Sequence, residues 1–162
     1  MPDRIAESIL ARLPARLHRW VLRGAHGLRK IWWRWRRPKL EGCRILALDE
    51  TGRLLLVRHS YGSKAWMPPG GGIKRNEDPM LAALREFSEE IGCLLISPRV
   101  VDVALDRLHG ADNKVYVVLG QCRGTPTPDR REITEARFFA PDALPDDVQA
   151  GLREKLPGWL AG

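Results

Sequence analysis

Residues 71–93 read GGIKRNEDPMLAALREFSEEIGC, and this stretch joins a glycine-rich loop to an acidic helix. Asp78 is a residue type that caps helix N-termini, and Pro79 occupies the first helical position, where its missing N–H costs nothing. Apolar residues then recur at helical spacing until Gly92 stops the helix. The sequence therefore predicts a helix over residues 79–91, directly after a flexible loop.

Three carboxylates lie on adjoining parts of this helix surface, at Glu86, Glu89 and Glu90. Like charges at this spacing repel each other by about 0.2–0.5 kcal/mol per pair, and a bound cation would remove that cost. Hard cations such as Mg²⁺ take oxygen ligands and share their coordination with substrate phosphates. Acidic runs on helices are more often solvated faces, and Arg85 could simply pair with Glu89. The glutamates alone leave both interpretations open.

Fixed spacings around the glutamates favour the metal site. From Gly71, Glu77 follows after five intervening residues and Arg85 follows after seven more. This arrangement resembles the Nudix box, G-x5-E-x7-R-E-U-x-E-E-x-G-U, in which U is a bulky apolar residue. Every specified position is filled, with Cys93 a slightly atypical final U. Residues 1–40 lie outside the resemblance.

The resemblance implies an α/β fold, namely an α/β/α sandwich around a mixed sheet, in which the box forms loop, helix and loop. It implies hydrolysis of a diphosphate bond in a nucleoside diphosphate linked to another moiety, a nucleoside triphosphate or ADP-sugar type of substrate. The implied cofactor is Mg²⁺ or Mn²⁺. The residues that would hold the metal are Glu86, Glu89, Glu90 and the Gly71 backbone.

Two further roles within the box follow from the same resemblance. Glu86 would either ligate the metal or help to activate water, and both roles stay open. Glu77 and Arg85 would orient the helix and loop through charge pairing. The expected catalytic residues are Glu77, Arg85, Glu86, Glu89 and Glu135.

Glu135 belongs to the segment EITEARFF at residues 132–139, which looks like the family's downstream strand. That strand often begins with an acidic residue near the metals. We expect Glu135 to be a further ligand or the base, with Glu132 as second choice, and a surface carboxylate as the alternative. The expected substrate-binding groups are Arg58, Gly71 and Gly72, although solvent exposure is the commoner fate of such an arginine.

The remaining pattern indicates a sheet around this helix. Alternating and β-branched runs predict a hairpin of residues 42–49 and 53–58, with a turn between them. The other expected elements are strands at 100–108, 114–122 and 135–140, an exposed loop at 123–131, and a last helix near 146–156.

Charge is unevenly distributed along the 162 residues. Residues 1–40 hold eleven basic and two acidic residues, whereas residues 41–162 hold sixteen and eighteen, so the net charge of +7 comes from the N-terminal segment. We expect a basic, amphipathic helical extension at 1–40 and the hydrolase domain at 41–162. Three cysteines without metal spacing, no secretory signal and no membrane-spanning run favour a cytoplasmic protein.

The N-terminal segment contains WWRWRR at residues 32–37, and three interpretations of it compete. Its apolar stripe could pack on the domain or on a second subunit in a homodimer. It could lie on a membrane surface, with peripheral localisation. Nucleic-acid contact ranks third. A second functional hypothesis is a Nudix-fold binding or regulatory protein held at a membrane or nucleic acid by residues 1–40, although a pure binder has no need for so many adjacent carboxylates.

Overall fold

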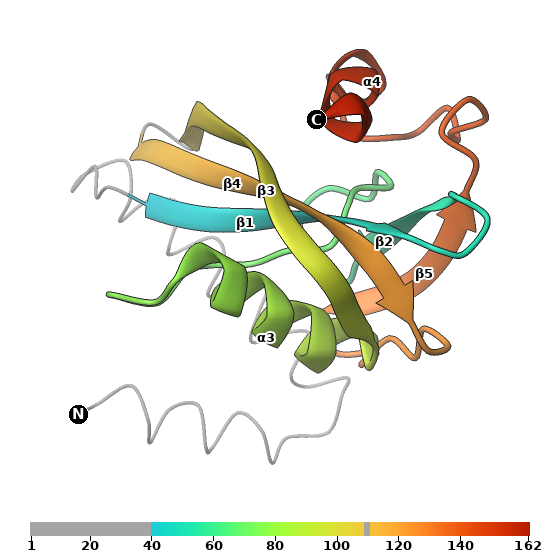
Figure 1. Ribbon diagram of the computed structural model, residues 1–162, viewed down its shortest axis with the longest axis horizontal. Coiled ribbons are helices and arrows are strands. Elements are labelled where there is room, and N and C mark those ends of the chain that lie inside the picture. Colours follow the sequence, from blue (N-terminus) through green and yellow to red (C-terminus); the bar gives the residue numbers. More distant parts are fainter. Residues whose placement is uncertain (1–39, 109–110) are drawn as a thin grey trace.

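The computed structural model describes residues 40–108 and 111–162 (Figure 1). The expected helical extension at 1–40 lies outside the described residues, except for Leu40. The described elements, in chain order, are β1 (Leu40–Leu48), β2 (Leu54–His59), α3 (Pro79–Ile91), β3 (Leu94–Leu108), β4 (Ala111–Arg123), β5 (Ile133–Phe139) and α4 (Leu152–Ala161).

The five strands form one mixed sheet in the order β3-β4-β1-β2-β5, with β1 parallel to β4 and the other neighbours antiparallel. β1 and β2 pair only near their turn, at Leu48 and Leu54. Beyond that pair the glycine-rich loop runs between them. Val57 of β2 and Met67 donate to each other's carbonyl oxygens at 2.8 and 3.1 Å, and Cys43 of β1 donates to the Gly71 carbonyl at 2.9 Å. The glycine-rich loop is therefore held between the two diverging strands by backbone hydrogen bonds to both of them.

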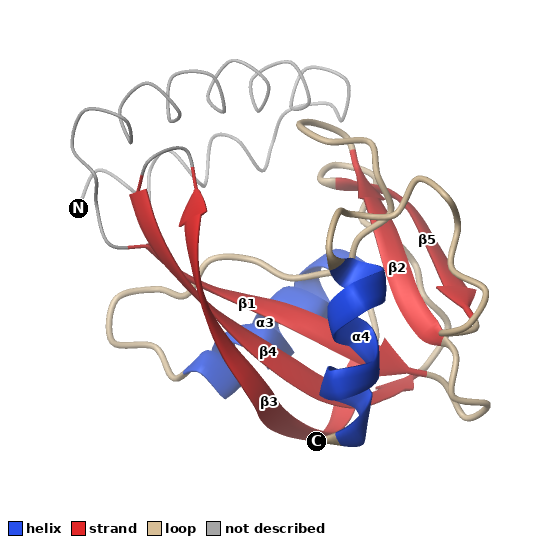
Figure 2. Ribbon diagram, turned by 90° about the horizontal axis from the view of Figure 1, so that it is seen from above, coloured by secondary structure: helices blue, strands red, loops and turns tan. Residues whose placement is uncertain are grey.

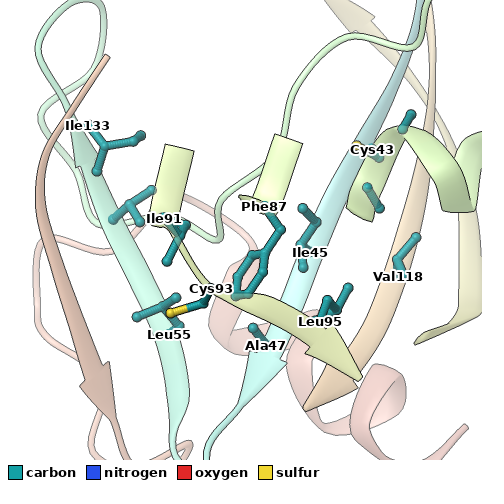
Figure 3. Packing of buried hydrophobic residues seen from close by; sticks show 13 residues of the cluster. Cys43, Ile45, Ala47, Leu55, Phe87, Ile91, Cys93, Leu95, Val118 and Ile133 are labelled. Carbon is teal, nitrogen blue, oxygen red and sulfur yellow. The ribbon is translucent and has the colours of Figure 1, made fainter. Parts of the chain in front are cut away.

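Helices cover both faces of the sheet: Figure 2 shows α4 in front of it and α3 behind. Alternation along β1 supplies both contacts, because Ile45 faces α3 whereas Leu46 faces α4. Phe87 points from α3 into its side of the core (Figure 3). On the other face, Trp159 of α4 is buried and its Nε1–H donates to the Asp102 carboxylate at 2.7 Å. The predicted α/β/α sandwich is confirmed.

Two elements start about six residues from their predicted first residues. The last helix begins at Leu152 rather than near 146, because the preceding residues pair with the loop: Trp66 donates to the Asp147 carbonyl and Gln149 donates to the Trp66 carbonyl. It continues through Pro157, since Trp159 must still be buried. The strand predicted at 100–108 starts at Leu94, and two register shifts carry it along β4. Neither described helix is long and apolar enough to cross a membrane.

Candidate active site

Helix α3 has the bounds that the sequence predicts. The Asp78 carboxylate accepts hydrogen bonds from the backbone N–H groups of Met80 and Leu81, at 2.9 and 3.2 Å. At the other end, Gly92 has φ of 70°, a conformation that favours glycine. These two caps place the glutamate-bearing turns of the helix beside the glycine loop.

Arg85 ties the loop to the helix through Glu77. Its Nε and Nη2 donate to the two carboxylate oxygens of Glu77 at 2.8 and 2.9 Å, which is a bidentate pair. The Lys74 backbone N–H also donates to Glu77, at 2.8 Å. The Arg85 hydrogen bonds are the main reason that the pKa of Glu77 is lowered to about 2. The charge pairing expected between these two residues is present.

The same guanidinium reaches the carboxylates of the next turn. Arg85 Nη1 donates to Glu86 Oε1 at 2.7 Å and lies 3.7 Å from Glu89 Oε2, while Nη2 donates to the Gly72 carbonyl at 3.2 Å. Glu86 is pressed against Gly71, where an added Cβ would stand 2.4 Å from the Glu86 carboxyl carbon. Glu86 is thus fixed on two sides, whereas the Glu89 side chain is exposed.

Glu90 is the buried member of the glutamate group, with 8% of its surface exposed. Its Oε2 atom is buried without any hydrogen-bond partner. Burial, followed by the charges of Glu86 and Glu132, raises the pKa of Glu90 to about 9. Burial also raises the pKa of Glu86, although Arg85 opposes this effect. An unpartnered buried carboxylate is costly, so a cation is the natural partner for this group.

This donor set fits a hard divalent cation, which takes carboxylate oxygens and backbone carbonyls. The fit rests on the partnerless oxygen of Glu90 and on Gly71, whose missing side chain lets the Glu86 carboxylate lie directly against the loop backbone. Within residues 40–108 and 111–162, no three His, Cys, Asp or Glu side chains already converge on one metal position. Glu86 and Glu89 are instead both paired with Arg85.

Glu132 and Glu135 have different surroundings. Glu135 lies 3.4 Å from Arg58 and 3.0 Å from Arg137, so it is ion-paired with arginines of β2 and β5. Glu132 accepts a hydrogen bond from the Tyr61 hydroxyl at 2.8 Å. Its charge contributes to the raised pKa of both Glu86 and Glu90. Which of these two acids joins the site stays a prediction, and the surroundings of Glu132 favour it over Glu135.

The loop at 123–131 is anchored to the end of α3 rather than simply exposed. The Thr127 N–H donates to the Ile91 carbonyl at 2.8 Å, and the Asp129 N–H donates to the Glu90 carbonyl at 3.2 Å. One Asp129 oxygen, Oδ1, accepts the backbone N–H groups of Arg131, Glu132 and Ile133. This is the aspartate turn that competes with regular structure. It brings the start of β5 to the glutamates.

The family model of the NUDIX domain matches residues 39–159. The chain belongs to the Nudix family. Among curated proteins it is similar to an RNA pyrophosphohydrolase of Saccharophagus degradans, with 44% identity over 59 residues, which is 36% of this chain and 35% of that protein. An RNA pyrophosphohydrolase of Psychrobacter cryohalolentis is 40% identical over 80 residues, 48% of this chain and 44% of that one. The matches span less than half of these relatives' length.

Solved Nudix structures share the fold. The MutT NUDIX hydrolase from Burkholderia pseudomallei superposes with a TM-score of 0.67 at 24% identity, covering 75% of this chain and 98% of that one. The MutT protein from Methanosarcina mazei superposes with a TM-score of 0.68 at 20% identity, covering 78% of this chain and 96% of that one. At these identities the likeness establishes the Nudix fold alone.

Arg58, which we expected to bind substrate, pairs with acids that do not belong to the Nudix box. It contacts the carboxylates of Glu135 and Asp147 and lies 4.6 Å from the centre of the buried Trp66 ring. These contacts join β2, β5 and the segment before α4. Gly71 and Gly72, by contrast, do lie beside the helix, since Arg85 reaches the Gly72 carbonyl.

Sequence reasoning assigned no role to Tyr61. Its ring lies 5.8 Å from that of His59, and its hydroxyl reaches Glu132. A tyrosine just past a strand end has no recognisable spacing to a carboxylate 71 residues away, so no signal was available. A cavity of about 390 Å³ lies at the β1–β2 turn, next to Arg53 and Phe138. None of the Nudix box glutamates lines it, so we do not place the chemistry there.

Proposed function

We propose that this chain is a metal-dependent pyrophosphohydrolase that cleaves a diphosphate bond in a nucleotide-type substrate. Mg²⁺ or Mn²⁺ would be bound by Glu86, Glu89 and Glu90, with the Gly71 backbone beside them. The observation that carries the proposal is the Glu90 carboxylate, which is buried with one oxygen lacking any partner. Glu86 and Glu132 add negative charge around it. A divalent cation would offset this charge.

When bound, such a metal lowers the pKa of its water, orients phosphate oxygens and neutralises charge on the leaving group. The chain's own residues organise the site. Arg85 takes Glu86 Oε1, which leaves Oε2 to face metal or water. Glu86 would serve as ligand or as the proton acceptor, and burial favours the second role by raising its pKa. Glu77 pairs with Arg85 and Arg85 pairs with Glu86, so one guanidinium connects the loop to the helix and to Glu86.

A terminal triphosphate is the substrate feature that we propose. Nucleoside triphosphates carry it, and so does the 5′ end of a primary RNA. The curated relatives named RNA pyrophosphohydrolase support including RNA among the candidates. The excess of basic residues in 1–40 would attract either polyanion. ADP-sugars stay among the candidate substrates, because the Nudix box defines the metal site and not the leaving group.

The test compares Glu89→Gln and Glu90→Gln with the wild type on three probes: GTP, ADP-ribose and a 5′-triphosphorylated oligoribonucleotide. Each is incubated with Mg²⁺, with Mn²⁺ and with EDTA, and the released phosphates are identified. We expect metal-dependent turnover that both variants lose. The matched control is Glu154→Gln, because Glu154 is exposed on α4 and far along the chain from the box.

Two outcomes would contradict the proposal. Full metal-dependent turnover in both glutamine variants would remove the catalytic assignment. Tight nucleotide binding without turnover of any probe would favour the other hypothesis, a Nudix-fold binding or regulatory protein.

A further inference from the structure

We propose that Tyr61 is a positioning residue that holds the Glu132 carboxylate in the metal site, acting together with Ser60. This inference rests on the proposed function, because it assumes that Glu132 works with the glutamates of α3. Tyr61 itself touches neither metal nor substrate in this proposal. It acts through Glu132 alone.

The contact between Tyr61 and Glu132 is direct and partly buried. The Tyr61 hydroxyl donates to Glu132 Oε2 at 2.8 Å. One residue earlier, the Ser60 N–H donates to the Glu132 carbonyl at 2.8 Å, and the Ser60 hydroxyl donates to the Arg131 carbonyl at 2.7 Å. Ser60 is buried, with 2% of its surface exposed. Ser60 and Tyr61 therefore hydrogen-bond to the backbone and to the side chain of Glu132, respectively.

A bulge between β2 and β5 brings Ser60 and Tyr61 into position for these hydrogen bonds. Arg58 is in register with Glu135, but the next residue, His59, is in register with Ile133, so Thr134 is skipped. The Thr134 hydroxyl instead donates to the Arg58 carbonyl at 3.0 Å. Bulges of this kind redirect side chains at functional sites. Here the shift brings residues 60 and 61 alongside 131 and 132.

Repulsion explains why Glu132 needs a holder. The Asp129 N–H donates to the Glu90 carbonyl at 3.2 Å and the Glu132 N–H donates to the Asp129 carboxylate at 3.0 Å, so the negative charge of Glu132 is held near the glutamates of α3. Without a donor, the Glu132 side chain would swing from these carboxylates towards solvent, because it is only partly buried. The Tyr61 hydrogen bond opposes that movement before a cation arrives. The ligand set is thus kept assembled by a neutral donor, which adds no charge to the site.

The experiment measures Mn²⁺ binding to the full-length protein from the electron paramagnetic resonance signal of free Mn²⁺, without substrate. Tyr61→Phe removes only the hydroxyl, and we expect it to weaken Mn²⁺ binding roughly tenfold, the lower end for residues that orient a metal ligand. The control is Tyr116→Phe, because Tyr116 is the other tyrosine and lies on β4 beside Lys114. It should bind Mn²⁺ like the wild type.

A double-mutant cycle separates positioning from a merely structural effect. In a Glu132→Gln background, Tyr61→Phe should cause no further loss of Mn²⁺ affinity, because the group it orients is gone. An equal loss in both backgrounds, or no loss in either, would overturn the inference. The Glu90→Gln variant separates failure of the proposed function from failure of the role of Tyr61. If Glu90→Gln leaves Mn²⁺ binding intact, the proposed function fails. If Glu90→Gln weakens Mn²⁺ binding but Tyr61→Phe leaves it intact, only the role of Tyr61 fails.

Discussion

Gly71 and Glu86 are in such close contact that a Cβ on Gly71 would stand 2.4 Å from the carboxyl carbon of Glu86. Real Cβ atoms do not approach other atoms so closely. Gly71→Ala must therefore displace the Glu86 side chain or the loop. A catalytic group moved by about 1 Å can cost on the order of a hundredfold in rate. We expect Gly71→Ala to lower kcat by one to two orders of magnitude, as measured by phosphate release.

The matched control for that change is Gly158→Ala on α4, where an added Cβ meets nothing within 4 Å. It should leave kcat unchanged and stability unchanged or slightly improved, since alanine favours helices. Thermal unfolding of both variants separates displacement of Glu86 from general damage. Wild-type turnover in Gly71→Ala would mean that Glu86 has no fixed position in the reaction.

The bidentate pair between Arg85 and Glu77 should make stability depend on acid pH. In the fold the pKa of Glu77 is about 2, against an ordinary value of 4.5. The ionised form is therefore the one that the fold stabilises. Its contribution is complete above about pH 4.5 and is lost as the pH falls from there towards 2. We expect Glu77→Gln to lower the free energy of unfolding by about 1.5 kcal/mol at neutral pH, the lower end for hydrogen bonds to charged groups.

Urea unfolding of Glu77→Gln and wild type at neutral pH and near pH 3 tests this dependence. The difference between them should shrink at the lower pH, because near pH 3 Glu77 is protonated in the unfolded wild-type chain while it stays ionised in the fold. Glu154→Gln, an exposed change of the same kind, should show no such trend. A constant difference at both pH values would mean that the loss comes from packing and not from charge.

Function and stability should conflict at Glu90. Its buried, unpartnered oxygen costs free energy in the metal-free protein, and the neighbouring charges of Glu86 and Glu132 add to that cost. With a pKa of about 9, Glu90 is protonated near neutral pH in the metal-free fold but ionised in the unfolded chain, and Glu90→Gln removes the cost of this protonation at nearly constant volume. In EDTA we expect the free energy of unfolding of this variant to exceed that of the wild type by about 1–3 kcal/mol, which should appear as a higher unfolding temperature. The same variant should lose turnover.

Adding Mg²⁺ provides the converse measurement. A ligand that binds only the folded state stabilises it, by about 2.7 kcal/mol at a hundred times its dissociation constant. The wild type should gain thermal stability with Mg²⁺, and Glu90→Gln should gain little. A glutamine variant that is less stable than the wild type in EDTA would show that the Glu90 carboxylate has a favourable partner in the fold.

The sequence predicted the local features of the site because they depend on short spacings. The caps at Asp78 and Gly92, the bounds of α3 and the pairing of Glu77 with Arg85 all lie within one 23-residue stretch. Periodicity and residue type are enough for the caps and the helix bounds, whereas the pairing of Glu77 with Arg85 was expected from the resemblance to the Nudix box. The hairpin of β1 and β2 was predictable for the same reason, since its turn is local.

Contacts between distant segments were not predictable from spacing. The strand pattern alone led us to expect Glu135 before Glu132, but it could not predict the bulge after Arg58, which places Glu132 beside Ser60 and Tyr61. The last helix was misplaced because residues 147–149 pair with Trp66, a contact that cancels their local preference. In both cases tertiary pairing outweighed propensity, and a single sequence carries no signal for it.

Removal of residues 1–38 should leave hydrolysis intact. All residues of the proposed site lie between Tyr61 and Glu132, and β1 keeps its first partner because Leu40 remains opposite Asn113 on β4. We expect the shortened chain to turn over GTP at the wild-type rate. With a 5′-triphosphorylated oligoribonucleotide, KM should rise and lose part of its salt dependence, because the segment carries ten basic residues that would attract the phosphates. Equal salt dependence in both chains would exclude that attraction, and co-sedimentation with anionic vesicles would then test the membrane alternative.

A shortened chain that folds, as judged by circular dichroism, but has lost all turnover would contradict the assignment of the active site to the Nudix domain alone.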